Sequence, residues 1–153
     1  MMTRCRRILG TLVALALLGC PSSEGRESGA ISCADRLDDW WRVSVSGPSA
    51  VTIRVDTVRA STAFDPGFDV YEVTSWSDDV EGIVLDRYVG GADDDFECRF
   101  APSTYECPLD TYEVETDFLL AVENLGSCRG TAGEYALEVF GADSVTYLGS
   151  EPR

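Results

Sequence analysis

The 153-residue chain contains no histidine and no lysine. Without histidine, it has no Ser-His-Asp or Cys-His catalytic arrangement and lacks the usual neutral ligand of zinc, copper and non-haem iron. Without lysine, Schiff-base chemistry and the lysine of phosphate-binding loops are excluded. No nucleophile elbow is present, and serines such as Ser44 and Ser127 have no base to activate them. We therefore predict that the protein is not an enzyme, and acid-base work by two carboxylates is the remaining catalytic alternative.

Basic side chains are scarce relative to acidic ones. The chain has 12 arginines against 27 Asp and Glu, for a net charge of −15. Binding to nucleic acid depends on neutralising phosphates with Lys and Arg, so we expect no nucleic-acid partner. An acidic surface keeps a domain soluble, and it also provides carboxylates that gather divalent cations.

Long apolar runs are absent except for residues 8–18, which follow three arginines, Arg4, Arg6 and Arg7. A basic start followed by an apolar stretch of about 7 to 15 residues is the form of a secretory signal. A membrane-spanning helix needs roughly 20 apolar residues, so this run is too short to cross a bilayer. We interpret residues 1–19 as a helical signal peptide that is removed from the mature protein.

The signal ends with Leu17, Leu18, Gly19 and Cys20, which resembles the lipobox of bacterial lipoproteins. The resemblance implies cleavage before Cys20, attachment of fatty acyl chains to the cysteine, and a protein held on a membrane surface by two or more chains. The residue after the cysteine is Pro21. An Asp at this position would resemble an inner-membrane retention signal of some bacteria, so we expect the protein at the outer membrane of the cell envelope. The alternatives are a plain cleaved signal and a short uncleaved anchor.

Cleavage of the leader would also remove Arg4, Arg6 and Arg7. The mature chain would then have 9 arginines against 27 carboxylates, a net charge near −18.

Four cysteines remain after Cys5 leaves with the leader and Cys20 is lipidated, and they are Cys33, Cys98, Cys107 and Cys128. An even number in a small exported domain predicts two disulfides, with three possible connectivities. We favour Cys98 with Cys107, closing a local hairpin, and Cys33 with Cys128. The alternative, a thiolate metal site, lacks any C-x-x-C pair.

The mature chain is divided into a tether and one domain. Residues 20–31 are rich in Ser, Gly and Glu and predict a flexible tether, whereas residues 32–149 are long enough for one domain with its own core. Apolar and polar residues alternate with the period of half-buried strands, and only residues 33–40 suggest a helical turn. The pattern predicts an all-β fold, a jelly-roll-like antiparallel β-sandwich of about eight strands. The predicted strands cover residues 41–46, 51–56, 68–73, 83–85, 96–100, 118–123, 135–140 and 145–148.

Aromatic residues recur along these predicted strands. We expect them to lie in the core, since burial is the commoner fate of large aromatic side chains, and the alternative is a platform that stacks on sugars. They are Trp41, Phe96, Phe100, Phe118 and Tyr135.

The order of motifs resembles the bacterial pre-peptidase C-terminal domain, a small β-sandwich usually found beside secreted proteases. Its opening pair of strands resembles residues 39–45 and 51–55, its middle strand resembles residues 64–73, and its acidic loop corresponds to residues 91–95. The family's Gly-x-Tyr-x-Leu-x-Val ending resembles residues 133–139. The resemblance covers about residues 38–140, and the segment 98–107 is not part of the pattern.

Some domains related to this family bind calcium through acidic loops, and calcium takes six to eight oxygen ligands. The resemblance therefore implies a possible calcium site on loop carboxylates, with no other cofactor required. The alternative is a solvated acidic loop that keeps sheet edges apart. The candidate ligands are Asp65, Asp69, Asp93, Asp94 and Asp95, with Asp78 and Asp79 behind them.

Together these patterns predict a lipid-anchored, non-catalytic β-sandwich of the cell envelope that binds a protein or polysaccharide partner. Two alternatives remain, a structural spacer without a specific ligand and a carboxylate-based hydrolase. A binding module exposes a contiguous apolar or aromatic patch on one sheet face, and an inert spacer does not.

Overall fold

The computed structural model describes residues 25–31, 37–59, 64–93, 96–97, 106–126 and 133–152. Within these ranges the secondary structure is almost entirely β-strand, with one short 3-10 turn, η1 (Val80–Gly82). The described part of the chain contains no helix long and apolar enough to cross a membrane. The predicted leader, residues 1–19, lies outside these ranges.

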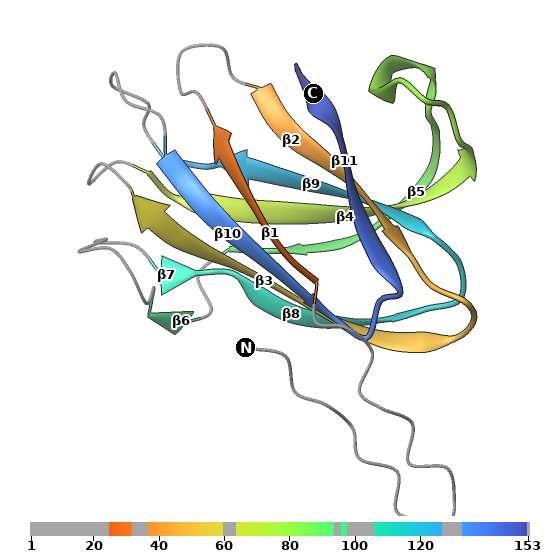
Figure 1. Cartoon of the computed structure of the whole chain (residues 1–153), viewed down its shortest axis with the longest axis horizontal. Helices are drawn as coiled ribbons and strands as arrows, with labels where there is room; N and C mark the ends of the chain where they lie inside the picture. Colours follow the sequence, from red (N-terminus) through yellow and green to blue (C-terminus); the bar gives the residue numbers. More distant parts are fainter. Residues whose placement is uncertain are drawn as a thin grey trace, which may run out of the picture.

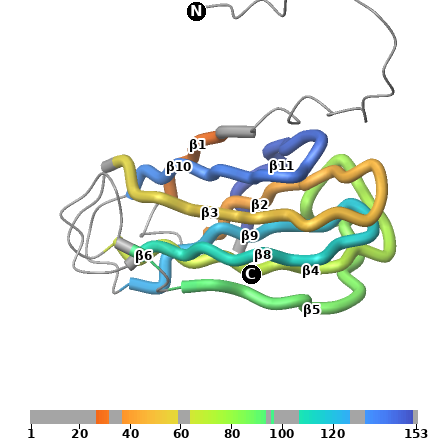
Figure 2. Tube along the Cα trace, turned by 90° about the horizontal axis from the view of Figure 1, so that it is seen from below, coloured from red at the N-terminus to blue at the C-terminus, as the bar shows by residue number. Residues whose placement is uncertain are grey.

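Two antiparallel sheets stack as a sandwich, which confirms the predicted fold class (Figure 1). The four-stranded sheet has the order β1-β10-β3-β8 and the five-stranded sheet the order β11-β2-β9-β4-β5. Figure 2 shows the strands running along nearly the same direction, with β5 at one edge of the molecule. The strands are β1 (Gly25–Ile31), β2 (Leu37–Ser44), β3 (Ser49–Arg59), β4 (Pro66–Ser75), β5 (Val84–Ala92), β6 (Phe96–Glu97), β7 (Glu106–Cys107), β8 (Leu109–Val114), β9 (Phe118–Asn124), β10 (Gly133–Phe140) and β11 (Ser144–Pro152).

Most connections carry the chain from one sheet to the other. Strands β1 to β4 alternate between the sheets, and so do β8 to β11, whereas β4 and β5 pair with each other as neighbours. This alternation is the jelly-roll-like arrangement that the sequence predicts. The small hairpin of β6 and β7 lies beside β3 and β8, at the opposite end of the molecule from the β4–β5 connection (Figure 1).

The core fills the space between the sheets with the inward side chains of both. Alternation places every second residue of a strand inside, and the inward residues of β2, β3, β4, β9 and β10 are almost completely buried. Among the predicted core aromatics, Trp41, Phe118 and Tyr135 are confirmed as buried. The prediction is wrong for Phe96, which packs over the Arg54 guanidinium at 4.0 Å on the outer side of β3. Phe100 lies outside the described residues.

Three local predictions are corrected by the structure. The tether prediction is wrong for Gly25–Ile31, which form β1 and pair with β10, because backbone pairing with an existing sheet edge needs no apolar pattern. The helical turn expected at residues 33–40 is wrong for residues 37–40, since Leu37–Ser44 form β2, and residues 33–36 lie outside the described ranges. Leu109–Val114 form β8, a strand that the sequence pattern does not predict.

A buried polar network ties β2 to its neighbours. Asp39 is 2% exposed, and its carboxylate accepts hydrogen bonds from Tyr135 Oη at 2.7 Å and Ser150 Oγ at 2.5 Å. Trp41 Nε1 donates to Tyr135 Oη at 2.9 Å. Burial, together with the Asp39 charge, raises the pKa of Tyr135 far above its usual value. A carboxylate in this position is satisfied only by donors from both sheets, so it helps to fix how the sheets pack.

Candidate functional site

The outer face of the five-stranded sheet is apolar where a sandwich usually presents polar residues to water. Trp40 on β2 and Leu119 and Ala121 on β9 point away from the core, yet all three are 5% exposed or less. Side chains from β4, β11 and the β4–β5 connection pack against them and form a second apolar cluster. Its partly buried members are Tyr71, Val73, Trp76, Val80, Ile83 and Leu148.

The cover over this cluster is incomplete and leaves a pocket of about 300 Å³. Each of the five strands contributes one lining residue, and the η1 region forms a side wall. A volume of this size is at the lower end of the range for small-ligand sites. We name it the Trp40 pocket, and its lining residues are Trp40, Tyr71, Val80, Glu81, Ile83, Leu85, Leu119 and Glu151.

Aromatic rings extend from the pocket along the sheet face. The Trp40 and Tyr71 ring centroids are 6.0 Å apart, and those of Tyr71 and Tyr88 are 5.6 Å apart. Tyr88 is 55% exposed, so the series of rings runs from a buried floor to open solvent. This is a contiguous aromatic patch on one sheet face.

Hydrogen-bond donors around the pocket are already used within the chain. Trp40 Nε1 donates to the backbone oxygen of Glu151 at 3.2 Å. Tyr71 Oη and Tyr88 Oη donate to the two carboxylate oxygens of Asp69, at 3.1 and 3.3 Å. The polar atoms that the lining side chains offer to a ligand are therefore mainly the carboxylate acceptors of Glu81 and Glu151.

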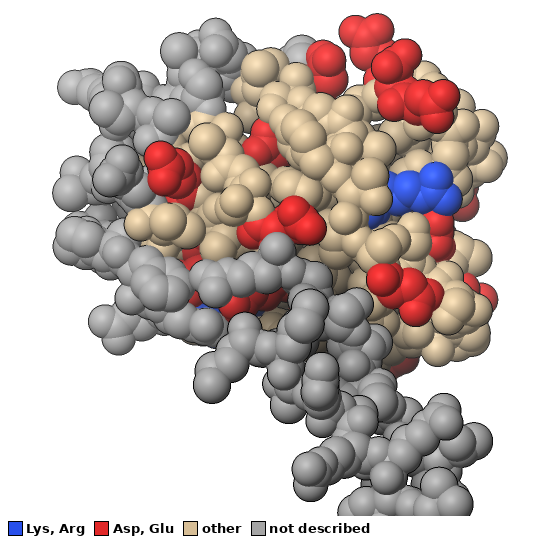
Figure 3. All heavy atoms as spheres, in the orientation of Figure 1, with Lys and Arg blue, Asp and Glu red and all other residues tan. Residues whose placement is uncertain are grey.

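The electrostatic surroundings of the pocket are acidic. Asp78 and Asp79, which precede η1, are exposed, and neither Glu81 nor Glu151 forms an ion pair within the described part of the chain. The three arginines whose side chains are described are paired with Asp117, Asp56 and Glu72. On the face drawn in Figure 3, acidic side chains are widely spread, whereas basic ones show mainly in one small area.

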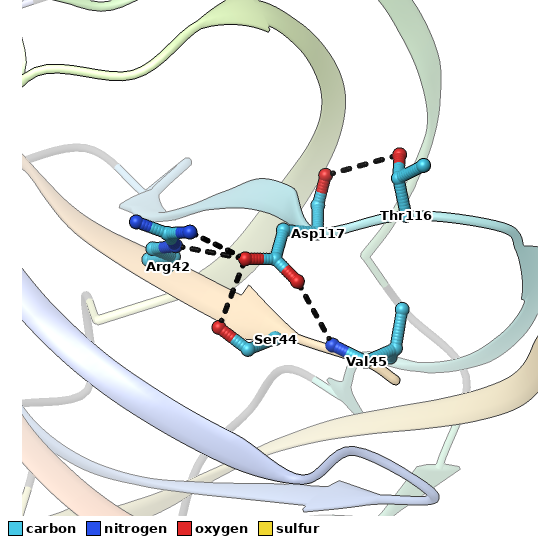
Figure 4. Close-up of polar contacts among 5 residues, drawn as sticks. All are labelled: Arg42, Ser44, Val45, Thr116 and Asp117. Carbon is cyan, nitrogen blue, oxygen red and sulfur yellow. Dashed lines mark hydrogen bonds and ion pairs between the residues drawn. The ribbon is translucent and has the colours of Figure 1, made fainter. Parts of the chain in front are cut away.

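One arginine lies on the same outer face as the Trp40 pocket. The Arg42 guanidinium lies 4.3 Å from the ring centroid of Trp76 and donates to Asp117 Oδ2 from Nε at 3.0 Å and Nη2 at 2.6 Å. Figure 4 shows Asp117 also accepting hydrogen bonds from Ser44 and the Val45 backbone. Burial raises the pKa of Asp117, but these hydrogen bonds and the Arg42 charge outweigh it and hold the pKa below its usual value.

The predicted calcium ligands are not assembled by the residues that the structure describes. Asp65 lies before β4, where its backbone N–H donates to Asn124 Oδ1 at 3.0 Å, while Asp69 receives the two tyrosine hydroxyls. Among the described residues, no three acidic or cysteine side chains form a group that could hold a metal ion. Asp94 and Asp95 lie outside the described ranges, so calcium binding stays a prediction.

Of the cysteines, only Cys107 falls within the described ranges. It is buried and disulfide-bonded, and its Sγ lies 3.9 Å from Asp56 Oδ1. Cys33, Cys98 and Cys128 lie outside, and so does Cys20, the predicted lipid site. The connectivity of the disulfides and the lipidation therefore stay predictions.

Sequence reasoning missed the residues that form the Trp40 pocket. A signal for them exists in residues 118–122, where every position is apolar instead of every second one. A continuous apolar run indicates a strand buried on both faces, and β9 is the central strand of its sheet. The doubled Trp40 and Trp41 carry the same signal on β2.

Comparison with known proteins finds no family model and no curated protein that matches this chain. The lipobox and the likeness to the pre-peptidase C-terminal domain therefore stay predictions from sequence motifs.

Proposed function

We propose that this protein is a non-catalytic binding module of the bacterial cell envelope, anchored by lipid on Cys20, and that it binds a polypeptide or polysaccharide partner through the Trp40 pocket. One observation carries the proposal. Side chains from all five strands of one sheet surround an apolar, aromatic hollow on the outside of the sandwich. Apolar concavities with a few polar groups are the usual form of binding sites.

The pocket favours a binding module over the alternative of a spacer. A spacer requires only a folded core, and the inter-sheet cluster provides one without the outer face. Next to the outer cluster, Leu85 in the pocket wall and Tyr88 against Tyr71 remain 43% and 55% exposed. Large apolar side chains grouped at a concave surface mark an interaction site more often than a bare structural surface.

The pocket also favours binding over carboxylate-based hydrolysis. A hydrolase of that type needs one carboxyl group kept protonated, usually by an apolar environment that excludes water. Of the two carboxylates that line the pocket, Glu81 is exposed and Glu151 is only half-buried. Neither has the buried environment that such an acid requires.

Lipid anchoring is tested by replacing the predicted acylated residue. We expect Cys20→Ser to move the protein from the membrane pellet to the soluble fraction, because the acyl chains supply the membrane affinity. The measurement is fractionation of cells that express either form. A variant that still pellets with membranes contradicts anchoring at Cys20.

Binding through the pocket is tested with one blocking variant and one control on the same strand. Leu85→Arg places a long side chain in the pocket wall, whereas Val84→Arg makes the same change at the preceding residue, which is 53% exposed and does not line the pocket. The test uses the full chain with Cys20→Ser, which removes the predicted lipid anchor. In this chain we expect Leu85→Arg to lower retention on washed cell envelopes at least tenfold, and Val84→Arg to leave retention unchanged. Equal retention of the two variants rejects the pocket as the binding site.

A further inference from the structure

We infer that the occupant of the Trp40 pocket is a basic polypeptide segment, in which one apolar side chain enters the hollow and neighbouring Lys or Arg side chains meet the carboxylates around it. This inference rests on the proposed binding function and specifies the chemistry of its partner. It follows from the shape, the charge and the unused hydrogen-bonding capacity of the pocket.

Charge complementarity selects the sign of the partner. Glu81, within η1, and Glu151, on β11, both line the pocket, and Asp78 and Asp79 precede η1. No arginine is among the lining residues, and the three described arginine side chains are neutralised by ion pairs. An anionic polymer is repelled from such a surface, whereas a cationic one is steered toward it.

The hydrogen-bonding groups of the pocket favour a cationic partner over a neutral sugar. A sugar hydroxyl both donates and accepts, so sugar sites commonly provide donors as well as acceptors. Here the Trp40 indole N–H is used by the Glu151 backbone, and the Tyr71 hydroxyl is used by Asp69. The carboxylate acceptors that remain are matched by ammonium and guanidinium groups, which only donate.

The same sheet face already contains the proposed type of contact within the chain. Arg42 lies between the Trp76 ring, 4.3 Å from its centroid, and the Asp117 carboxylate. A ring face and a carboxylate together hold a guanidinium through cation–π attraction and a charge-assisted hydrogen bond. Around the pocket, Tyr71 and Trp40 supply the ring faces, and Glu81 and Glu151 supply the carboxylates.

The test uses short probes and the full chain in mild detergent. Three acetylated peptide amides, Arg-Phe-Arg, Ser-Phe-Ser and Glu-Phe-Glu, differ only in the charge beside one aromatic side chain, and chitotetraose provides a neutral sugar. The readout is the indole N–H resonance of Trp40, which lies at the pocket floor. We expect Arg-Phe-Arg to bind at least tenfold tighter than Ser-Phe-Ser, and Glu-Phe-Glu to leave the resonance unchanged.

Variants of the carboxylates identify the cause of the preference. The double variant Glu81→Gln, Glu151→Gln should weaken Arg-Phe-Arg about fivefold and leave Ser-Phe-Ser unaffected, which is the size expected for two exposed charge pairs. The matched control is Glu113→Gln, Glu134→Gln, which changes two exposed carboxylates of the other sheet and should have no effect.

The outcomes separate this inference from the binding function. Equal binding of the basic and neutral peptides, tighter binding of chitotetraose, or no binding of any peptide overturns the basic-segment inference. If Leu85→Arg still abolishes retention on envelopes in that case, the pocket remains a binding site for a partner of different chemistry. If Leu85→Arg and Val84→Arg are retained equally, the binding function itself is wrong.

Discussion

The two sheets of the sandwich differ most on their outer faces. On the four-stranded sheet the outward residues of β3 are polar, and Arg54 pairs with Asp56 at 3.2 Å beneath Phe96 and the β6–β7 hairpin. On the five-stranded sheet the outward residues Trp40, Leu119 and Ala121 are apolar, and side chains of the β4–β5 connection pack against them. Each outer face thus has a covering segment, but one segment covers an ion pair and the other covers apolar side chains.

The completeness of the two covers differs as well. Under the β6–β7 hairpin, Asp56 is 2% exposed, and Cys107 on β7 itself is fully buried. Under the β4–β5 connection, Trp40 and Leu119 are buried, but a pocket of about 300 Å³ remains beside them. Charged groups tolerate contact with water, so the ion pair does not require its closed cover, whereas apolar surface left open to water is the kind that marks interaction sites. The open cover therefore marks the face that is suited to binding.

The largest effect is expected at the floor of the Trp40 pocket. Leu119→Ala removes a side chain that is 1% exposed and should lower the free energy of unfolding by about 3 to 4 kcal/mol, because it leaves a cavity. Leu85→Ala, on the exposed wall, should change it by no more than about 0.5 kcal/mol. Urea denaturation measures both. Similar losses for the two variants contradict the division into a structural floor and an exposed wall.

The ion pair on the opposite face should come next. Arg54→Met leaves the Asp56 carboxylate without its arginine and should lower the free energy of unfolding by about 3 kcal/mol, as expected when one partner of a buried pair is removed. Adding Asp56→Leu to the same chain should restore part of the loss. A double variant that is less stable than Arg54→Met alone shows that the carboxylate acts through other contacts.

Replacing Cys107 tests how much its disulfide stabilises the β6–β7 hairpin that covers the four-stranded sheet. Cys107→Ser should lower the free energy of unfolding by about 2 kcal/mol if the bond closes the short loop to Cys98. Mass mapping without reduction should place Cys107 with Cys98 and Cys33 with Cys128. A bond from Cys107 to either of the other cysteines refutes the local hairpin bridge.

Apart from the control Leu85→Ala, the smallest effect is expected at Asp117, on the open face. Asp117→Asn removes the charge that accepts hydrogen bonds from Arg42, Ser44 and Val45, and should cost about 1 kcal/mol at pH 7 because the site is partly solvated. The folded-state pKa of Asp117 lies below its unfolded value of about 3.9, so the carboxylate stabilises the fold above that pH. The stabilisation disappears as the pH falls through the folded-state pKa.

The measurement is thermal unfolding of both proteins between pH 7 and pH 2. The difference between the native protein and Asp117→Asn should be greatest at neutral pH and should vanish in strong acid. A difference that stays constant with pH would falsify the electrostatic origin of the effect.

The fold was more predictable than the site, for a physical reason. Alternation identifies strands that are buried on one face, which is why the strands around Val43, Ile53, Val70 and Leu137 were found. The sequence pattern does not predict β1 because pairing through the backbone requires no apolar side chains, as Gly25–Ile31 demonstrate. It does not predict β8 because that strand buries only two alternating residues, Tyr112 and Val114.

The Trp40 pocket could not be predicted from the sequence for a different reason. Its floor residues lie in continuous apolar runs, which a sequence pattern cannot distinguish from those of an ordinary buried strand. Part of its wall comes from the connection 76–83, which has no periodic pattern. Which strands become neighbours is decided by sheet order, and sheet order brings Trp40, Leu119 and Tyr71 together from distant parts of the chain.

The early start of β1 limits how far the domain can stand from a membrane. Only four residues, 21–24, separate the predicted lipid site Cys20 from Gly25, where β1 begins. Five peptide units span at most about 18 Å when fully extended, which is less than the thickness of a bilayer. A lipid on Cys20 would therefore hold the sandwich almost in contact with the head groups.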